Sequence, residues 1–298
     1  MTASMAPWFG VYLPQLRMEY PTILERTLAA EAVGFHSAWF MDHMAAPMRA
    51  DADTLEGWSL VAALAAVTTH IRLGHLVTAD PFRHPAVLAK MAATVDVISG
   101  GRLELGVGWG SVPAELETYG ITHDTAPTRA ARLAESLTVM QLMFSGETFD
   151  FDGTFFTLRG ASGRPTPVQD PLPIHIGGVG PKLTMPLVRG YAHYWNCPCY
   201  GADRFAELKA LAGDARATLQ RPVARARTAA ERDDVVALGQ KRFGSWGGLV
   251  AGTADEVAAV LRADVAAGVE GFILQFTDFG ATPTLEHFMA EVAPQVRA

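Results

Sequence analysis

The sequence predicts an α/β protein built as a (β/α)8 TIM barrel, with residues 1–298 in a single domain. Three observations favour this fold: short apolar runs alternate with segments of helical character, eight such runs can be counted, and a helical segment follows each of them. The runs end near Gln15, Asp42, Val77, Gly108, Gly177, Asn196, Thr228 and Phe276. A doubly wound parallel sheet stays open as the alternative, because it has the same alternation of elements.

The stretch from residue 71 to residue 110 is the clearest part of this pattern. Ile71–Val77 is predicted to be a strand, Pro85–Val97 a helix, and Leu103–Val107 a second strand that ends in GVGWG. Ahead of this unit, the sequence predicts strands over Trp8–Gln15 and Ser37–Met41 and helices over Tyr20–Val33 and Trp58–Thr69.

The second half of the chain continues the alternation with two insertions. Strands are predicted over Pro173–Gly178, Tyr191–Asn196, Val223–Thr228 and Gly271–Phe276. Helices are predicted over Thr128–Phe144, Pro181–Arg189, Ala202–Leu219, Ala254–Ala267 and Leu285–Val296, with Thr253 as the cap of the fourth. An Asp-Gly turn between β-prone halves predicts an inserted hairpin at about residues 146–160. Residues 231–250 are polar and then Gly-rich without clear periodicity, which predicts a late mobile insertion segment.

Composition and charge narrow the class of protein. Apolar residues make up 49% of the chain and charged residues 18%, which is typical of a soluble enzyme. The net charge of −7 and the lack of a basic run argue against nucleic acid as a partner. No segment approaches the ~20 apolar residues of a membrane span, and the N-terminus does not resemble a signal peptide. We therefore expect a cytoplasmic protein that acts on a small molecule and does not contact a membrane.

The two cysteines, Cys197 and Cys199, are separated by one residue. This spacing is poorly suited to a mutual disulfide, and two thiols are too few for a structural zinc site. We expect two reduced thiols and no metal site.

Barrel enzymes place their active sites at the carboxyl ends of the strands, which gives a short set of candidates. The set contains Gln15, Asp42, His43, Val77, Thr78, Trp109, Ser111, Gly177, Gly178, Trp195 and Asn196. Asp42-His43 is the obvious proton-handling pair, because it joins a carboxylate to the side chain that titrates near neutral pH. From the residues alone, catalysis and the capping of the next helix both remain open for this pair.

Two glycine-rich loops follow strands, in GVGWG and in IGGVG. Exposed backbone N–H groups in such loops are able to hold one phosphate between them. The alternative, equally compatible with the sequence, is that these glycines only permit tight turns.

Motifs along nearly the whole chain resemble the luciferase-like monooxygenase superfamily, from Phe9 to about Phe276. They are the RHP, SGGR and GVGxG elements of FRHPAVLAKMAATVDVISGGRLELGVGWG, with GFHSAWFMDH before them and PIHIGG and GTADEVAAVLRADVAAGVEGFIL after them. The resemblance is closest to the branch of coenzyme F420-dependent oxidoreductases. It implies a (β/α)8 barrel with an inserted hairpin, a mobile segment, and a deazaflavin or flavin lying across the carboxyl mouth of the barrel.

The resemblance also implies roles for individual residues. His43 would exchange a proton beside the cofactor ring, and Asp42 would contact the cofactor. Leu76-Val77 would form a non-proline cis peptide behind the ring, with Thr78 within reach of it. The implied phosphate loops are Gly108, Trp109, Gly110 and Ser111 on one side and Gly177, Gly178 and Val179 on the other.

The sequence departs from relatives at positions that affect the substrate. Gln15 stands where close deazaflavin dehydrogenases often have a glutamate, Ser111 stands where some relatives have a carboxylate, and the basic cluster that recognises sugar phosphates has no clear counterpart. We expect hydride transfer between the deazaflavin C5 and a small uncharged organic substrate, with Gln15, Trp109 and Trp195 around the substrate pocket.

Two other functions stay open. One is an FMN-dependent monooxygenase that uses reduced flavin and O2, and the other is a flavin-binding protein without turnover. The resemblance also implies a homodimer.

Overall fold

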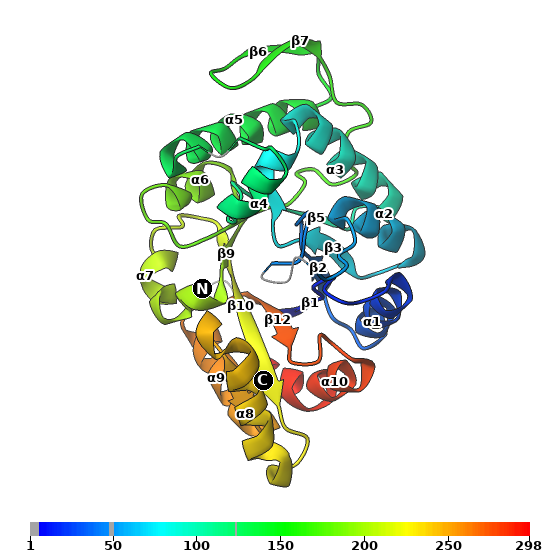
Figure 1. Cartoon of the computed structure of the whole chain (residues 1–298), viewed down its shortest axis with the longest axis vertical. Coiled ribbons are helices and arrows are strands. Elements are labelled where there is room, and N and C mark those ends of the chain that lie inside the picture. Colours follow the sequence, from blue (N-terminus) through cyan, green and yellow to red (C-terminus); the bar gives the residue numbers. More distant parts are fainter. Residues whose placement is uncertain (1–5, 48–50, 123) are drawn as a thin grey trace.

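The computed structural model describes residues 6–47, 51–122 and 124–298, and it forms a closed barrel of eight parallel strands inside a ring of helices (Figure 1). The barrel strands are β1 (Trp8–Tyr12), β2 (Ser37–Phe40), β3 (Arg72–His75), β5 (Leu103–Gly108), β8 (Ile174–Gly177), β9 (Tyr194–Cys197), β10 (Arg216–Arg225) and β12 (Gly271–Phe276). They pair in this order, and β12 pairs with β1 to close the ring. The predicted TIM barrel is confirmed, and an open doubly wound sheet is excluded.

Helices follow the strands and surround the barrel, except that α4 lies inside the ring of outer helices (Figure 1). They are α1 (Tyr20–Ala32), α2 (Gly57–Val67), α3 (Pro85–Ser99), α4 (Pro113–Thr118), α5 (Ala126–Phe144), α6 (Thr184–Tyr191), α7 (Phe205–Lys209), α8 (Arg232–Phe243), α9 (Ala254–Ala266), α10 (Thr282–His287) and α11 (Ala293–Arg297). Short 3₁₀ turns span Asp80–Phe82, Cys199–Arg204, Ala229–Glu231 and Gly244–Trp246, and a π turn spans Phe288–Val292. Two short strands extend the sheet. They are β4 (Thr78–Ala79), which pairs with β5, and β11 (Val250–Gly252), which pairs with β10.

Local sequence signals explain where several helices begin and end. At the start of α3, His84 accepts a hydrogen bond from the Ala86 N–H and Pro85 occupies the first turn, while Gly100 ends the helix at a φ of 66°. Thr253 caps α9, as the sequence predicted, and it forms a capping box with Glu256. His84 is therefore a helix cap in this chain.

The inserted hairpin consists of β6 (Phe149–Asp152) and β7 (Thr157–Ala161), and it projects beyond α5 at one end of the molecule (Figure 1). The Glu135 carboxylate on α5 accepts hydrogen bonds from the N–H groups of Thr154, Phe155 and Phe156 at 2.7, 2.9 and 3.3 Å. The turn of the hairpin is thus anchored to the barrel by one side chain.

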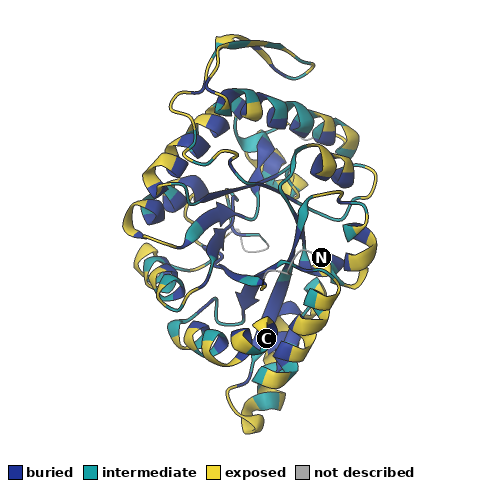
Figure 2. Ribbon diagram, turned by 180° about the vertical axis from the view of Figure 1, so that it is seen from behind, coloured by how far each residue is buried: buried dark blue, intermediate teal, exposed yellow. Residues whose placement is uncertain are grey.

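The core has two layers. The strands are almost wholly buried, whereas the helices bury only their inner faces (Figure 2).

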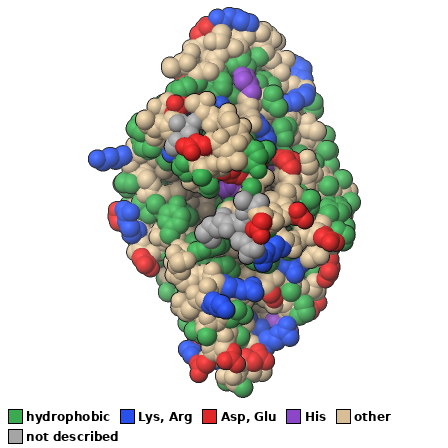
Figure 3. All heavy atoms as spheres, in the orientation of Figure 1, with side chains coloured by type: hydrophobic (Ala, Val, Ile, Leu, Met, Phe, Trp, Pro, Cys, Tyr) green, Lys and Arg blue, Asp and Glu red, His purple; other side chains and the backbone are tan. Residues whose placement is uncertain are grey.

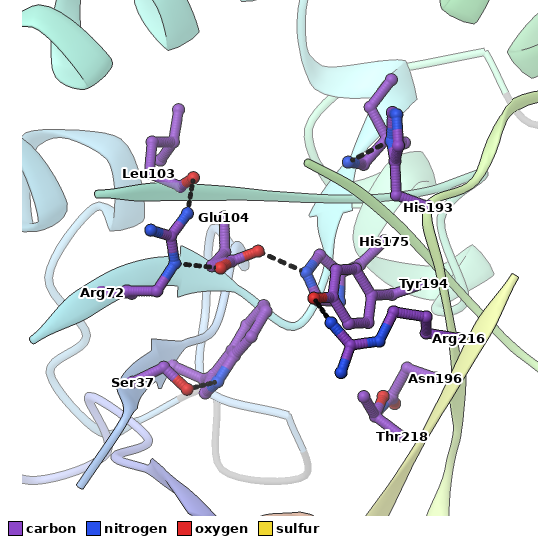
Figure 4. A network of polar contacts seen from close by, with 12 residues as sticks. Ser37, Arg72, Leu103, Glu104, His175, His193, Tyr194, Asn196, Arg216 and Thr218 are labelled. Carbon is purple, nitrogen blue, oxygen red and sulfur yellow. Dashed lines mark hydrogen bonds and ion pairs between the residues drawn. The ribbon is translucent and has the colours of Figure 1, made fainter. Parts of the chain in front are cut away.

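Inside the barrel, near the amino ends of the strands, a polar network surrounds Glu104. Its carboxylate accepts a hydrogen bond from Arg72 and lies 2.6 Å from Nε2 of His175 (Figure 4). His175 stacks on Tyr194, whose hydroxyl accepts from Arg216 at 2.8 Å. Burial raises the pKa of Glu104, but His175 and Arg72 outweigh burial and hold that pKa below its ordinary value.

The region between β9 and β12 differs from the prediction. The predicted helix Ala202–Leu219 is wrong beyond α7, because β10 already begins at Arg216. The predicted strand Val223–Thr228 covers only the end of β10. The strand was hidden by its charged residues, and these are paired: Arg216 with Glu270, and Arg221 with Asp264.

The late insertion contains more regular structure than its sequence indicated. Residues 231–250 include the twelve-residue helix α8, and they lead through β11 into α9 before the chain re-enters the barrel at β12. The helix has acidic residues in its first turn and basic residues in its last turn, which complements the helix dipole.

Candidate active site

A cavity of about 350 Å³ opens at the carboxyl ends of the barrel strands. Figure 3 looks onto the face of Figure 1 and shows a hollow near its middle, with hydrophobic and acidic side chains around it. Most of the residues named from the sequence line this one cavity: Asp42, His43, Leu76, Val77, Thr78, Gly108, Trp109, Gly110, Ser111, Gly177, Gly178 and Val179. The volume lies in the range of small-molecule sites.

The floor of the cavity is a bulge between β3 and β4. The peptide bond between Leu76 and Val77 is cis, as the resemblance implied. Glycines make room for this bulge: a Cβ on Gly106 would meet the His75 carbonyl oxygen at 2.0 Å, and one on Gly108 would meet Cγ2 of Val77 at 2.7 Å. The glycines of β5 therefore serve a close approach of two chain segments as well as any phosphate.

The two glycine-rich loops follow the neighbouring strands β5 and β8, and both line the cavity. Gly110 and Gly178 have φ angles of 79° and 130°, which other residues adopt with strain. The Gly178 N–H donates to the Asn196 carbonyl at 3.2 Å, so this donor is already used by the protein. Both loops contribute backbone to the lining, which is the arrangement needed to hold a phosphate.

Asp42 is buried and fully engaged by its neighbours. Its carboxylate accepts from the Ala79 N–H at 2.9 Å and from two nitrogens of Arg83 at 2.7 and 2.9 Å. Arg83 also contacts Glu56 at 2.7 Å. Burial lowers the pKa of Arg83, but the hydrogen bonds and charge of Asp42 outweigh burial, so the pKa is raised. Asp42 is thus one half of a bidentate ion pair in the cavity wall.

His43 lies beside Asp42 but has a different partner. Its Nδ1 is 2.8 Å from Oε2 of Glu115, and the side chain of Glu115 is only 9% exposed. The other oxygen of Glu115 accepts from the N–H groups of Met44 and Ala45 at 2.6 and 3.2 Å. The sequence did not single out Glu115, because the strand-end rule covers only the residues that directly follow a strand. An acidic residue on the short helix after GVGWG was the available signal.

Two residues predicted around the substrate pocket lie outside the cavity lining. Gln15 is 1% exposed, and its amide bonds to both the carbonyl and the N–H of Met41 at 2.9 and 2.8 Å, which ties the end of β1 to β2. Trp195 is fully buried against Phe205 and donates from Nε1 to the Gly178 carbonyl at 2.8 Å. Trp195 thus supports the Gly178 loop from behind, Gln15 joins two strand ends, and of the three predicted residues Trp109 lines the cavity.

The rest of the lining is mostly apolar. It consists of Ala79, Phe82, Val112, Glu115, Leu116, Leu133, Ile176, Gly180, Thr184, Leu187, Asn196, Pro198, Tyr200 and Gln220. No lysine or arginine is among the lining residues in the part of the chain that the structure describes. The charged side chains there are the two carboxylates of Asp42 and Glu115, and both are paired.

The lining fits a planar cofactor with a phosphate. The Thr78 hydroxyl is buried in the cavity wall and has no hydrogen-bond partner within the described ranges, so it is free to bond a ring atom. The Val77 side chain offers an apolar support. Within those ranges no group of three His, Cys, Asp or Glu side chains is placed to hold a metal ion, and none of the described helices is both long and apolar enough to cross a membrane.

Comparisons with known proteins agree with this geometry. Residues 5–236 match the family described as luciferase-like monooxygenase. An F420-dependent glucose-6-phosphate dehydrogenase of Microbacterium testaceum is 34% identical over 163 residues, which cover 54% of this chain and 48% of that protein. The chain thus spans about half the length of the curated relatives it matches.

Two solved structures illustrate the shared fold. An F420-dependent secondary alcohol dehydrogenase in complex with an F420-acetone adduct superposes with a TM-score of 0.83 at 20% identity, over 99% of this chain and 100% of the other. The oxygenating constituent of 3,6-diketocamphane monooxygenase from Pseudomonas putida, in complex with FMN, gives 0.77 at 19% identity over 97% and 99%.

Proposed function

Because the chain belongs to the luciferase-like monooxygenase family, we propose that it is an oxidoreductase that uses coenzyme F420 to move a hydride to or from a small uncharged organic substrate. One observation carries the proposal: the Leu76–Val77 bulge, two glycine-rich loops and His43 line the same cavity. The relative named as an F420-dependent glucose-6-phosphate dehydrogenase supports the choice of cofactor.

The lining residues would have two roles, which are to hold the cofactor and to transfer a proton. Leu76 and Val77 would support the ring, the Thr78 hydroxyl would bond it, and the loops at residues 108–111 and 177–179 would take the phosphate. When bound, the deazaflavin supplies the carbon C5 that accepts or gives the hydride. Nδ1 of His43 is engaged by Glu115, so Nε2 is the nitrogen that exchanges a proton with the substrate.

The same lining favours an uncharged substrate. A phosphorylated sugar needs cationic partners, and the described lining offers none. Both carboxylates are committed to the protein, which leaves apolar side chains and the polar side chains of His43, Thr78, Ser111, Thr184, Asn196, Tyr200 and Gln220 to meet the ligands. A small alcohol or carbonyl compound suits this surface better than an ion.

A binding experiment separates F420 from FMN. We expect titration of the purified protein with F420 to change the fluorescence of the deazaflavin, with a weaker response to FMN. Tight FMN binding without any response to F420 would favour the FMN-dependent monooxygenase, whose structural counterpart in Pseudomonas putida carries FMN.

A second experiment separates catalysis from cofactor storage. The variant His43→Ala is expected to keep its affinity for F420 and to lose turnover by about 10²-fold or more. The control is His70→Ala, because His70 is exposed and does not line the cavity. Unchanged turnover in His43→Ala would overturn the role of His43.

The protein is further proposed to be a cytoplasmic homodimer. Both cysteines are free and buried, as expected in a reducing compartment. Exposed apolar side chains lie on the neighbouring helices α2 and α3: Val67, Val87, Val97 and Ile98, each 44–53% exposed. Light scattering tests the dimer, and the double variant Val87→Glu/Ile98→Glu is expected to be monomeric.

A further inference from the structure

The carboxylate of Glu115 is placed between His43 and the backbone that follows it. We propose that Glu115 is a positioning residue that fixes which ring nitrogen of His43 carries the proton. The proposal rests on the role given to His43 above, and it extends that role to a residue on a different element, 72 positions away in the sequence.

The hydrogen bonds of Glu115 leave one arrangement for the neutral histidine. An ionised carboxylate only accepts hydrogen bonds, and its Oε2 lies 2.8 Å from Nδ1 of His43. Nδ1 therefore carries the hydrogen, and in the neutral ring Nε2 is left with a lone pair. Because the Glu115 side chain is 9% exposed, water competes weakly for this bond.

The second oxygen of Glu115 holds the backbone of the same loop. It accepts from the N–H groups of Met44 and Ala45 at 2.6 and 3.2 Å. The helix that carries Glu115 is itself fixed, because Leu116 is 1% exposed. One side chain thus sets both the path of the chain after His43 and the rotation of its ring.

Asp42, the adjacent carboxylate, does not orient the His43 ring. Its two oxygens accept from Arg83 and from the Ala79 N–H. Neighbouring residues at the end of β2 therefore have separate partners, and the proton on His43 is controlled from α4.

The chemical consequence concerns oxidation of an alcohol. Nε2 of His43 would accept the proton of the alcohol hydroxyl, and a bound deazaflavin would supply the acceptor for the hydride of the carbinol carbon, so that the alcohol becomes a carbonyl compound. Glu115 then faces an imidazolium and stabilises it through the Nδ1–H bond. If the hydrogen were on Nε2 instead, the ring would have no lone pair to accept the proton.

The variant Glu115→Gln should move the ring hydrogen of His43 from Nδ1 to Nε2, while the side chain at position 115 keeps its size and shape. Its amide oxygen is able to accept from Met44 and Ala45, and its NH2 group then faces Nδ1 and must donate to it. We expect the neutral ring to carry hydrogen on Nδ1 in the parent and on Nε2 in the variant. Long-range ¹H–¹⁵N correlation spectra of the cofactor-free protein in alkaline buffer measure this directly, with His43→Gln used to assign the signals.

Kinetics give the second readout. In Glu115→Gln, kcat for substrate oxidation should fall by about 10²-fold, with F420 affinity changed by less than about threefold because the loop is retained. Glu115→Asp, which keeps a carboxylate, should keep the Nδ1–H form and recover part of kcat. The matched control is Glu117→Gln, an exposed residue on the same helix, which should change neither the spectrum nor kcat.

A parent protein with the hydrogen on Nε2 would overturn the proposal, as would a Glu115→Gln variant with unchanged tautomer and turnover. The spectra need neither cofactor nor substrate. Failure of the proposed F420 chemistry would therefore leave the tautomer result standing, and the two failures remain distinguishable. If Glu115→Gln does not fold, the parent spectrum and Glu115→Asp still decide the question.

Discussion

Asp42, which lines the cavity, forms a bidentate ion pair with Arg83, whose nitrogens lie 2.7 and 2.9 Å from the two carboxylate oxygens. Asp42 is 4% exposed, and the side chain of Arg83 is 14% exposed. The next residue, His43, is held by Glu115 on α4. Two carboxylates thus hold the residues that follow β2: Asp42 binds Arg83, and His43 binds Glu115.

Removal of Arg83 is expected to destabilise the protein. The variant Arg83→Ala leaves a buried carboxylate with only the Ala79 N–H, so the free energy of unfolding should fall by about 3 kcal/mol or more in urea. The control Arg159→Ala breaks an exposed pair with Asp152 and should leave the free energy of unfolding almost unchanged. If both variants had the same free energy of unfolding, the buried pair would contribute no more to stability than the exposed pair.

A methyl group on Gly108 is expected to weaken cofactor binding. The Cβ of Gly108→Ala would lie 2.7 Å from Cγ2 of Val77, so the bulge must move. F420 affinity should fall by about tenfold, equal to roughly 1.4 kcal/mol. Gly190→Ala in α6 is the control, since its Cβ meets nothing within 4 Å, and a helix gains about 0.5–1 kcal/mol from this change. Parent-like affinity in Gly108→Ala would contradict the role of the glycine.

Stability is expected to decrease below about pH 6.5. Burial is the main cause that lowers the pKa of His36, His75 and His193. For each group, the unfolded chain binds a proton near the ordinary value of about 6.5 before the folded chain does. The contribution of these groups to the free energy of unfolding is therefore complete above that pH. It falls as the pH decreases towards the lowered pKa values of the folded protein, by up to about 1.4 kcal/mol per group per pH unit.

Urea unfolding at several pH values measures this slope. His75→Asn should reduce it, because His75 is 1% exposed, packs against the Trp58 ring and has an Nε2 without a partner in the described residues. A free energy of unfolding that stays constant between about pH 7.5 and pH 5.5 would contradict the prediction.

The two thiols are expected to be inert in the folded protein. Burial, the largest cause, raises the pKa of Cys197 to about 12, and burial also raises the pKa of Cys199. Because the thiolate is the reactive form, iodoacetamide at about pH 8 should label neither residue in buffer and both in urea. Mass spectrometry reads the label, and rapid labelling of Cys199 in buffer would mean that residues 199–204 open.

The barrel and most of the cavity could be predicted from the sequence because they follow from strand ends and glycine-rich loops. The cis peptide was implied only by the family resemblance. Sequence reasoning failed at β10, where Arg216 and Arg221 sit in a barrel strand by pairing with residues 54 and 43 positions away. Such partners are invisible to a local pattern. The strand-end rule also places Gln15 and Trp195 at the correct end of the barrel, but it does not say which way a side chain points.

Glu115 shows the same limit more sharply. Its identity as an acidic residue was readable, but its contact with His43 depends on α4 turning back inside the ring of outer helices (Figure 1). The direction of a short helix after a loop is set by tertiary packing, here by buried Leu116. No period or motif in the sequence encodes that direction.

The partners of Asp42 and His43 follow them in the chain by 41 and 72 residues. On a ribosome, both residues therefore emerge well before the side chains that hold them. A nascent chain that has completed β2 has the histidine but not its orientation, and only docking of the unit that carries α4 supplies it. The orientation of His43 should consequently arise only after residue 115 has been synthesised and the unit that carries α4 has docked.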